Sequence, residues 1–229
     1  MWTISEVKEL GKRAFKANYW YCVLAAFLMS LFAGSRVAAS NSQTQNSDLQ
    51  SQFSNMPPEQ QRAVAAALLG GAAVALLIGL AIKIFLANPV NVGGCAFFTG
   101  NAENAPAPFS LMKTGFQNYG HTFVTLFLRD LYLMLWSLLF LIPGIIKAYS
   151  YRMVPYILAD NPDMPANEII TRSREMMDGN KWQAFVLDLS FLGWVLLGIL
   201  TLGLGFVLWT GPYMQSTYAA LYLKLRNEA

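Results

Sequence analysis

The sequence contains few of the side chains on which catalysis and metal binding depend: one histidine and two cysteines among 229 residues. His121 has no cysteine or carboxylate beside it, and a lone histidine is more often a hydrogen-bonded structural residue than a catalytic base. Cys22 and Cys95 lack the CxxC spacing of redox and zinc motifs, so we expect two reduced thiols. Phosphate-binding loops, nucleophile elbows and HExxH motifs are also missing. We therefore predict no enzymatic activity, no cofactor and no metal site.

Charged residues are scarce as well. They make up 13% of the chain, against roughly 25% in ordinary soluble domains, while 55% of the residues are hydrophobic. Several apolar runs approach the ~20 residues that cross a bilayer as a helix. The net charge of +3 does not indicate nucleic-acid binding, because the cations cluster beside apolar runs and form no continuous stripe. The composition predicts an all-α, polytopic integral membrane protein whose partners are membrane lipids.

Three stretches of the chain look like copies of one another, at about 1–98, 107–160 and 165–226. Each has a short amphipathic helix, an asparagine hinge, a long apolar run and an apolar helix that contains proline. The hinges are at Asn18, Asn118 and Asn180, and the prolines are Pro89, Pro155 and Pro212. Such a repeat predicts one membrane domain over 1–229, built from three helical hairpins.

Six spans follow from the apolar runs, at 19–37, 63–86, 122–142, 145–159, 184–200 and 206–223. The spans at 145–159 and 206–223 are short, so a re-entrant or interfacial placement of these two segments is the alternative. In the 63–86 span, Gly71, Ala75 and Gly79 recur at four-residue spacing, which favours close packing of another helix, from this chain or a second copy.

The cations predict the orientation by the positive-inside rule. Those assigned to the cytoplasmic side are Lys8, Lys12, Arg13, Lys16, Lys113, Arg172, Arg174, Lys181, Lys224 and Arg226, which places both termini in the cytoplasm. The opposite side receives only Arg36, Arg62 and Lys147. The stretch 40–61 is rich in Gln, Ser and Asn, so we expect a flexible external loop there.

The amphipathic helices before the spans have two readings. They could be elbows that fix where each hairpin enters the membrane, which the repeat itself favours. They could also form a cytoplasmic collar that docks a partner or senses lipid. In either reading they lie along the membrane surface, with Trp20 and Trp182 at headgroup depth.

Charges inside the predicted spans are the best functional candidates, because each costs free energy in lipid unless it is paired or hydrated. They are Arg129, Asp130, Arg152 and Asp188. Neighbouring helical residues point about 100° apart, so we expect Arg129 and Asp130 to have different partners. Asp188 then meets Arg129 or Arg152, and Asp130 meets the other arginine. The four residues form either ion pairs that lock the second hairpin to the third or a polar cavity that binds a ligand.

Three segments carry a family resemblance: IPGIIKAYSYRMVPYILAD at 142–160, SREMMDGNKW at 173–182 and FVLDLSF at 185–191. They resemble an integral membrane family of unknown function that is common in Gram-positive bacteria. More distantly, that family is similar to the membrane domain of some glycerophosphodiester phosphodiesterases. The likeness covers most of the chain and is absent from 40–61. It implies a multi-span protein of the bacterial cytoplasmic membrane, and it carries over no catalytic residue.

Two classes of function remain open on these observations. In the first, the protein is a scaffold, regulator or immunity-type protein that binds lipid, a membrane partner or a second copy of itself. In the second, it is a transporter or permease for a small or amphiphilic solute. A scaffold predicts closed ion pairs among the four charges, whereas a transporter predicts a water-filled cavity around them.

Overall fold

The computed structural model describes residues 2–33, 56–139 and 141–228. Throughout these ranges the regular structure is helical and contains no strand, which confirms the all-α fold class. The described residues divide into two compact units. One comprises residues 1–29 with 88–229, and the other comprises residues 30–87, wholly inside the first predicted repeat.

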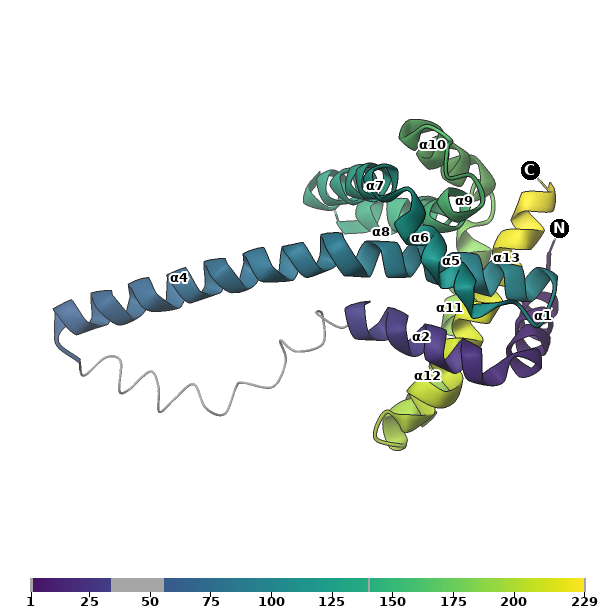
Figure 1. The fold of residues 1–229 in the computed structure, drawn as a ribbon, viewed down its shortest axis with the longest axis horizontal. Coiled ribbons are helices and arrows are strands. Elements are labelled where there is room, and N and C mark those ends of the chain that lie inside the picture. Colours follow the sequence, from purple (N-terminus) through teal and green to yellow (C-terminus); the bar gives the residue numbers. More distant parts are fainter. Residues whose placement is uncertain (1, 34–55, 140, 229) are drawn as a thin grey trace. The chain divides into compact units, whose positions relative to one another are not determined.

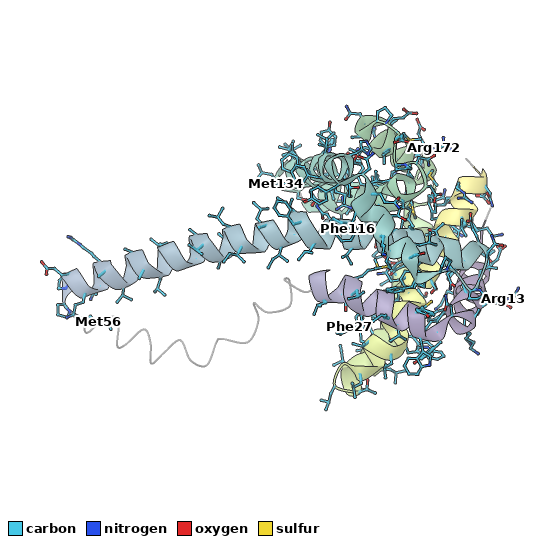
Figure 2. The ribbon with its side chains drawn as sticks, viewed as in Figure 1. Arg13, Phe27, Met56, Phe116, Met134 and Arg172 are labelled. Carbon is cyan, nitrogen blue, oxygen red and sulfur yellow. The ribbon has the colours of Figure 1, made fainter. Side chains whose placement is uncertain are left out.

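The smaller unit contains a long apolar helix. This helix, α4 (Pro58–Ile82), continues into a π-helical turn, η2 (Lys83–Ala87). Proline is well suited to the first turn of a helix, where N–H groups have no helical partner, and 58–61 are therefore helical. The prediction of a loop at 40–61 is therefore wrong for residues 58–61, whereas residues 40–55 lie outside the described residues. No side chain of α4 is buried, and Figure 2 shows them projecting along its whole length.

In the larger unit, each hinge asparagine lies between two helices, and these helices can be followed in Figure 1. Its backbone carbonyl accepts a hydrogen bond from the amide four residues later: Cys22 at 3.0 Å, Thr122 at 2.9 Å and Ala184 at 2.9 Å. The next helix therefore begins at the asparagine in all three places. The segments before the hinges are α1 (Ile4–Ala17), η3 (Phe109–Lys113) with α6 (Thr114–Gln117), and α10 (Ala166–Met176). Those after them are α2 (Tyr19–Ala33), α7 (Tyr119–Leu139), and α11 (Lys181–Leu189) with α12 (Leu192–Leu200).

The three prolines distort their helices at matching places. Proline has no N–H, so the carbonyl four residues before it loses its helical partner. Pro89 follows η2 and lies in α5 (Asn88–Glu103), while Pro212 follows the π-helical turn η4 (Phe206–Thr210) and lies in α13 (Gly211–Glu228). At Pro155 the break is complete, because α8 (Leu141–Ser150) ends and α9 (Val154–Asp160) restarts after a turn.

The proline helices form the core of the larger unit. Helix α5 packs against both α9 and α13, and the rings of Tyr156 and Tyr222 stack at 5.3 Å between α9 and α13. Each amphipathic segment covers the proline helix of the preceding repeat: η3 and α6 lie on α5, and α10 lies on α9. The first amphipathic helix, α1, lies on the last proline helix, α13. Within the larger unit, the three proline helices and the segments that cover them therefore close into a ring.

Among the residues that the structure describes, three helices are long and apolar enough to cross a membrane: Pro58–Glu103, Tyr119–Leu139 and Lys181–Leu200, with a shorter apolar helix at Tyr19–Leu31. This agrees with a membrane protein, but six spans are not confirmed. The predicted span 145–159 is interrupted by a turn at 151–153, and α8, with 10 residues, reaches only about 15 Å. In the predicted span 206–223, much of α13 is buried against protein.

The structure leaves the packing role of Gly71, Ala75 and Gly79 as a prediction. Nothing in the described residues comes within 4 Å of a Cβ placed on Gly71 or Gly79.

Candidate functional site

Two of the four predicted charges form a bidentate ion pair between the second and third predicted repeats. Arg152 lies in the turn between α8 and α9 that Pro155 imposes, and Asp188 lies on α11. The Nη1 and Nη2 groups of Arg152 donate to Oδ2 and Oδ1 of Asp188 at 2.9 Å and 2.8 Å. The hydroxyl of Tyr149 donates to Oδ2 as well, at 2.9 Å. Both oxygens of the Asp188 carboxylate are therefore hydrogen-bonded.

Aromatic rings complete this site, which we call the Arg152 cluster (Tyr149, Arg152, Asp188 and Tyr218). The guanidinium of Arg152 lies 4.1 Å from the centroid of the Tyr218 ring, which comes from α13, and 5.6 Å from that of Tyr149. Cation–π contacts of this kind compensate a guanidinium that has lost water. The cluster joins α8, α11 and α13, although these helices are far apart in the sequence.

The other two charges pair within α7. Both Nε and Nη2 of Arg129 donate to Oδ1 of Asp130, at 3.0 Å and 2.7 Å. The expectation that neighbours on a helix must have different partners was wrong here. The angle of about 100° separates the Cα–Cβ directions of the two residues. The arginine side chain is long enough to bend over the helix surface and reach its neighbour. The structure thus pairs Asp188 with Arg152, one of the two arginines expected for it, and Asp130 with Arg129.

The hinge asparagines connect successive repeats through their side chains. The amide of Asn18 donates to Asn101 Oδ1 and to the Ala107 carbonyl, both at 3.0 Å. That of Asn118 donates to the Pro162 carbonyl at 3.3 Å. The two carbonyl acceptors, those of Ala107 and Pro162, lie just before the next amphipathic segment.

The third hinge asparagine, Asn180, connects the last predicted repeat to the first. Trp2, just before α1, donates its indole N–H to Asn180 Oδ1 at 2.9 Å. Neither Trp2 nor Asn101 stood out in the sequence, because a buried asparagine or tryptophan has no local pattern.

A second cluster, which we call the Arg226 cluster, joins the carboxyl ends of all three proline helices. Arg226 on α13 donates to Glu103 on α5, and to Asp160 at the end of α9 at 2.8 Å. Tyr222 donates to the same Asp160 carboxylate at 2.6 Å. Burial opposes the charge of Arg226, but the hydrogen bonds to Glu103 and Asp160 outweigh it and raise its pKa.

The sequence did contain a signal for this cluster. Glu103 and Arg226 have opposite charges and stand the same number of residues after Pro89 and Pro212. When the predicted repeats are aligned at their prolines, Glu103 and Arg226 therefore occupy equivalent positions. A ring of repeats would bring such equivalent residues close together.

Residues 138–229 match the model of a protein family described as "Protein of unknown function (DUF975)". The match covers less than half of the chain. It includes the turn with Arg152, helix α11 with Asp188, and α13 with Arg226. No curated protein and no solved structure matches the chain. The resemblance to an uncharacterised family is thus supported for the C-terminal part of the chain, whereas a bacterial origin and the likeness to phosphodiesterase membrane domains stay predictions.

A pocket of about 270 Å³ lies where α8, α10 and α11 meet. We call it the basic pocket; it is lined by Lys147, Ser150, Thr171, Arg174, Glu175, Asp178 and Lys181. The prediction that Lys147 lies on the membrane side opposite Arg174 and Lys181 is wrong, because the three residues line one pocket. Helix α8 is short and ends at Ser150, whose carbonyl accepts a hydrogen bond from Ser173 of α10 at 2.9 Å. Lys147 is therefore held beside α10.

The described part of the chain contains no group of three or more His, Cys, Asp or Glu side chains that could hold a metal ion. Cys22 and Cys95 are both buried and free.

Proposed function

We propose that this protein is an integral membrane scaffold or regulator, without enzymatic activity of its own, that binds lipid or a partner in the membrane. The closed ion pair between Arg152 and Asp188 carries this proposal. Both carboxylate oxygens and both terminal nitrogens of the guanidinium take part in the pair. These groups tie one part of the protein to another and leave little hydrogen-bonding capacity for a solute.

The surface of the apolar helices supports the same proposal. Large hydrophobic side chains are exposed toward the ends of α7 and α12, among them Leu138 at 80% and Leu200 at 78%. Soluble proteins rarely expose large contiguous apolar patches, and such patches mark contact with a membrane or a partner. The helices therefore offer apolar faces to lipid or to another membrane protein, while the polar groups hold the repeats together.

Transport of a small or amphiphilic solute is the second candidate, and the π-helical turns favour it. The turns η2 and η4 lie directly before Pro89 and Pro212, and such turns are frequent at functional sites. At η4, however, the Leu208 carbonyl that Pro212 deprives of its helical partner accepts a hydrogen bond from the Tyr19 hydroxyl at 3.1 Å. This contact stabilises the distorted turn in its present form.

The proposal is tested by comparing Asp188→Asn with the paired swap Arg152→Asp and Asp188→Arg. If the pair is a structural tie, Asp188→Asn should lower the free energy of unfolding by about 1.5–3 kcal/mol, as expected for losing a hydrogen bond between charged groups. The paired swap should recover part of that loss. Unfolding in detergent measures both effects, and native mass spectrometry of the same samples identifies the molecules that remain bound.

Either of two results would favour transport instead. One is the loss of a defined bound solute from Asp188→Asn without a loss of stability. The other is a paired swap that is as stable as the wild type but no longer retains that solute. The control is Asp163→Asn, a change of the same type at an exposed residue between α9 and α10.

A further inference from the structure

The basic pocket has more positive charge than its own carboxylates neutralise. It contains Lys147, Arg174 and Lys181 together with two carboxylates. One of these, Asp178, pairs with Lys181 at 3.0 Å. Within the described ranges, neither the Lys147 ammonium nor the Arg174 guanidinium has a carboxylate within ion-pair distance. Arg174 and Lys181 also repel the Lys147 ammonium electrostatically. An anion placed between Lys147 and Arg174 would relieve this repulsion.

The three cations of the pocket come from three different helices. The Lys147 ammonium lies 4.6 Å from the centroid of the Trp136 ring on α7, which is a cation–π contact. Arg174 lies on α10 and Lys181 starts α11. Thr171 adds a hydroxyl group to the lining, whereas the Ser150 hydroxyl already donates to the Ile146 carbonyl at 3.0 Å. Hydrogen-bond donors of these kinds from several helices are suited to the oxygens of a phosphate.

Exposed apolar side chains directly adjoin the two lysines. Ile145 and Ile146 precede Lys147 in α8 and are 51% and 49% exposed, and Trp182 follows Lys181 and is 74% exposed. Basic residues next to exposed aliphatic and aromatic side chains are typical of a membrane interface. The ligand that fits both features is an amphiphile with a negatively charged head.

We propose that the basic pocket binds the phosphate of an anionic phospholipid headgroup, held by Lys147 and Arg174. The acyl chains lie against the apolar surface that begins at Ile146 and Trp182. This proposal specifies the class of lipid in the proposed lipid-binding function, and it rests on that function. It contains neither Arg152 nor Asp188, so the two proposals fail in different experiments.

The test uses the full-length protein, purified in detergent and stripped of lipid, with native mass spectrometry as the readout. Phosphatidylglycerol and phosphatidylcholine of equal chain length are added in separate titrations. We expect the wild type to prefer phosphatidylglycerol. In Lys147→Gln with Arg174→Gln, the affinity for phosphatidylglycerol should fall about tenfold or more. The reason is that each basic residue near an anionic headgroup contributes up to about tenfold in affinity, and the variant removes two.

The matched control is Lys12→Gln with Arg13→Gln on α1, which removes the same charge from two exposed residues far from the pocket in sequence. This variant should keep the preference. An equal loss in both variants would overturn the proposal, because general surface charge would then explain the preference. Should the pocket variant not fold, Arg174→Gln alone, at an exposed residue, repeats the test with a smaller expected loss.

A parallel titration with inorganic phosphate separates the two sources of the anion. The proposal expects phosphate to compete only weakly with phosphatidylglycerol. Binding of inorganic phosphate by a protein that shows no preference for phosphatidylglycerol over phosphatidylcholine would identify a site for a free anion and would overturn the lipid assignment.

Discussion

At the scale of single residues, buried polar side chains specify how the repeats join. Asn18 is 7% exposed and Asn101 is 1% exposed, and the two form one network. Asn18 donates to Asn101, while Asn101 donates to the Ala14 carbonyl at 2.8 Å and accepts from the Ala107 amide at 3.1 Å. Removing one member of such a network leaves buried partners without a hydrogen bond, which costs more than the bond itself contributes.

The repeat offers a matched comparison of equivalent asparagines. We expect Asn18→Ala to lower the free energy of unfolding by about 1–3 kcal/mol, because it leaves the Ala107 carbonyl unpaired in a buried site. Asn118→Ala should change it by no more than about 0.5 kcal/mol, since the Asn118 side chain is exposed and its hydrogen bond is long. Unfolding of both variants in detergent checks this. Equal effects would show that the asparagine backbone conformation, and not the buried network, determines stability at the hinge.

Glu6 predicts a pH dependence at the same scale. It accepts a hydrogen bond from Lys224 on α13, and this bond is the main cause that lowers the pKa of Glu6. A lowered pKa in the folded state means that Glu6 stabilises the fold above its unfolded pKa of about 4.3. That contribution is lost as the pH falls through the folded pKa.

Glu6→Gln should therefore lower the melting temperature at pH 7 and leave it unchanged well below pH 4.3. Thermal unfolding of the wild type and the variant at each pH measures the difference. A difference that persists at the acidic pH would mean that Glu6 acts by packing or by a neutral hydrogen bond.

At the scale of elements, close approach between amphipathic and proline helices depends on small residues. A Cβ placed on Gly11 of α1 would lie 2.6 Å from both Cα and Oγ1 of Thr217 on α13. Because these are largely backbone contacts, the helices would have to move apart. In the third repeat, Ser173 stands the same distance before its hinge asparagine as Gly11 does, and its hydroxyl reaches the end of α8.

Gly11→Ala should destabilise the protein by about 1–3 kcal/mol, the usual cost of forcing extra volume into a packed contact. Gly120→Ala is the control, because Gly120 is also helical but has nothing within 4 Å of a Cβ. There, alanine should stabilise the helix by up to about 1 kcal/mol. Opposite signs in the two unfolding measurements would support the contact, whereas stabilisation by both changes would show that α1 tolerates a larger spacing.

At the scale of the whole molecule, the ring of repeats brings the two ends of the chain together. Helix α1 packs on α13, and Glu6 pairs with Lys224 between them. Figure 1 shows N and C at the same end of this unit. Because Glu6 and Lys224 lie outside the predicted spans, their ion pair predicts that both ends of the chain lie on the same side of a membrane. That requires an even number of crossings or re-entrant hairpins.

We therefore expect reporters fused to the two termini to indicate the same side of the membrane. The positive-inside rule predicts that this side is the cytoplasm. Fusions to green fluorescent protein, which is fluorescent in the cytoplasm, and to alkaline phosphatase, which is active outside it, measure this. A fluorescent fusion at one end together with an active phosphatase at the other would contradict the packing of α1 on α13 in the membrane.

The sequence by itself determined the fold class and the local breaks. Hydrophobic composition and periodicity depend on residues near one another in the chain, so apolar helices, amphipathic helices and junctions at Asn18, Asn118 and Asn180 could be predicted from it. Proline acts on the carbonyl four residues before it, which is also local. These features required no knowledge of which helices meet.

Only the tertiary structure decided the partners. Arg152 meets Asp188 rather than Arg129, Lys147 lies with Arg174, and 145–159 is divided by a turn. Lys224 and Glu6 are 218 residues apart, and Asn18 and Asn101 are 83 apart. Contacts over such distances depend on how every intervening helix packs, and side-chain length and rotamer then select among several compatible partners. No local pattern contains that information, because the free energy of each contact is gained only when the ring of repeats has closed.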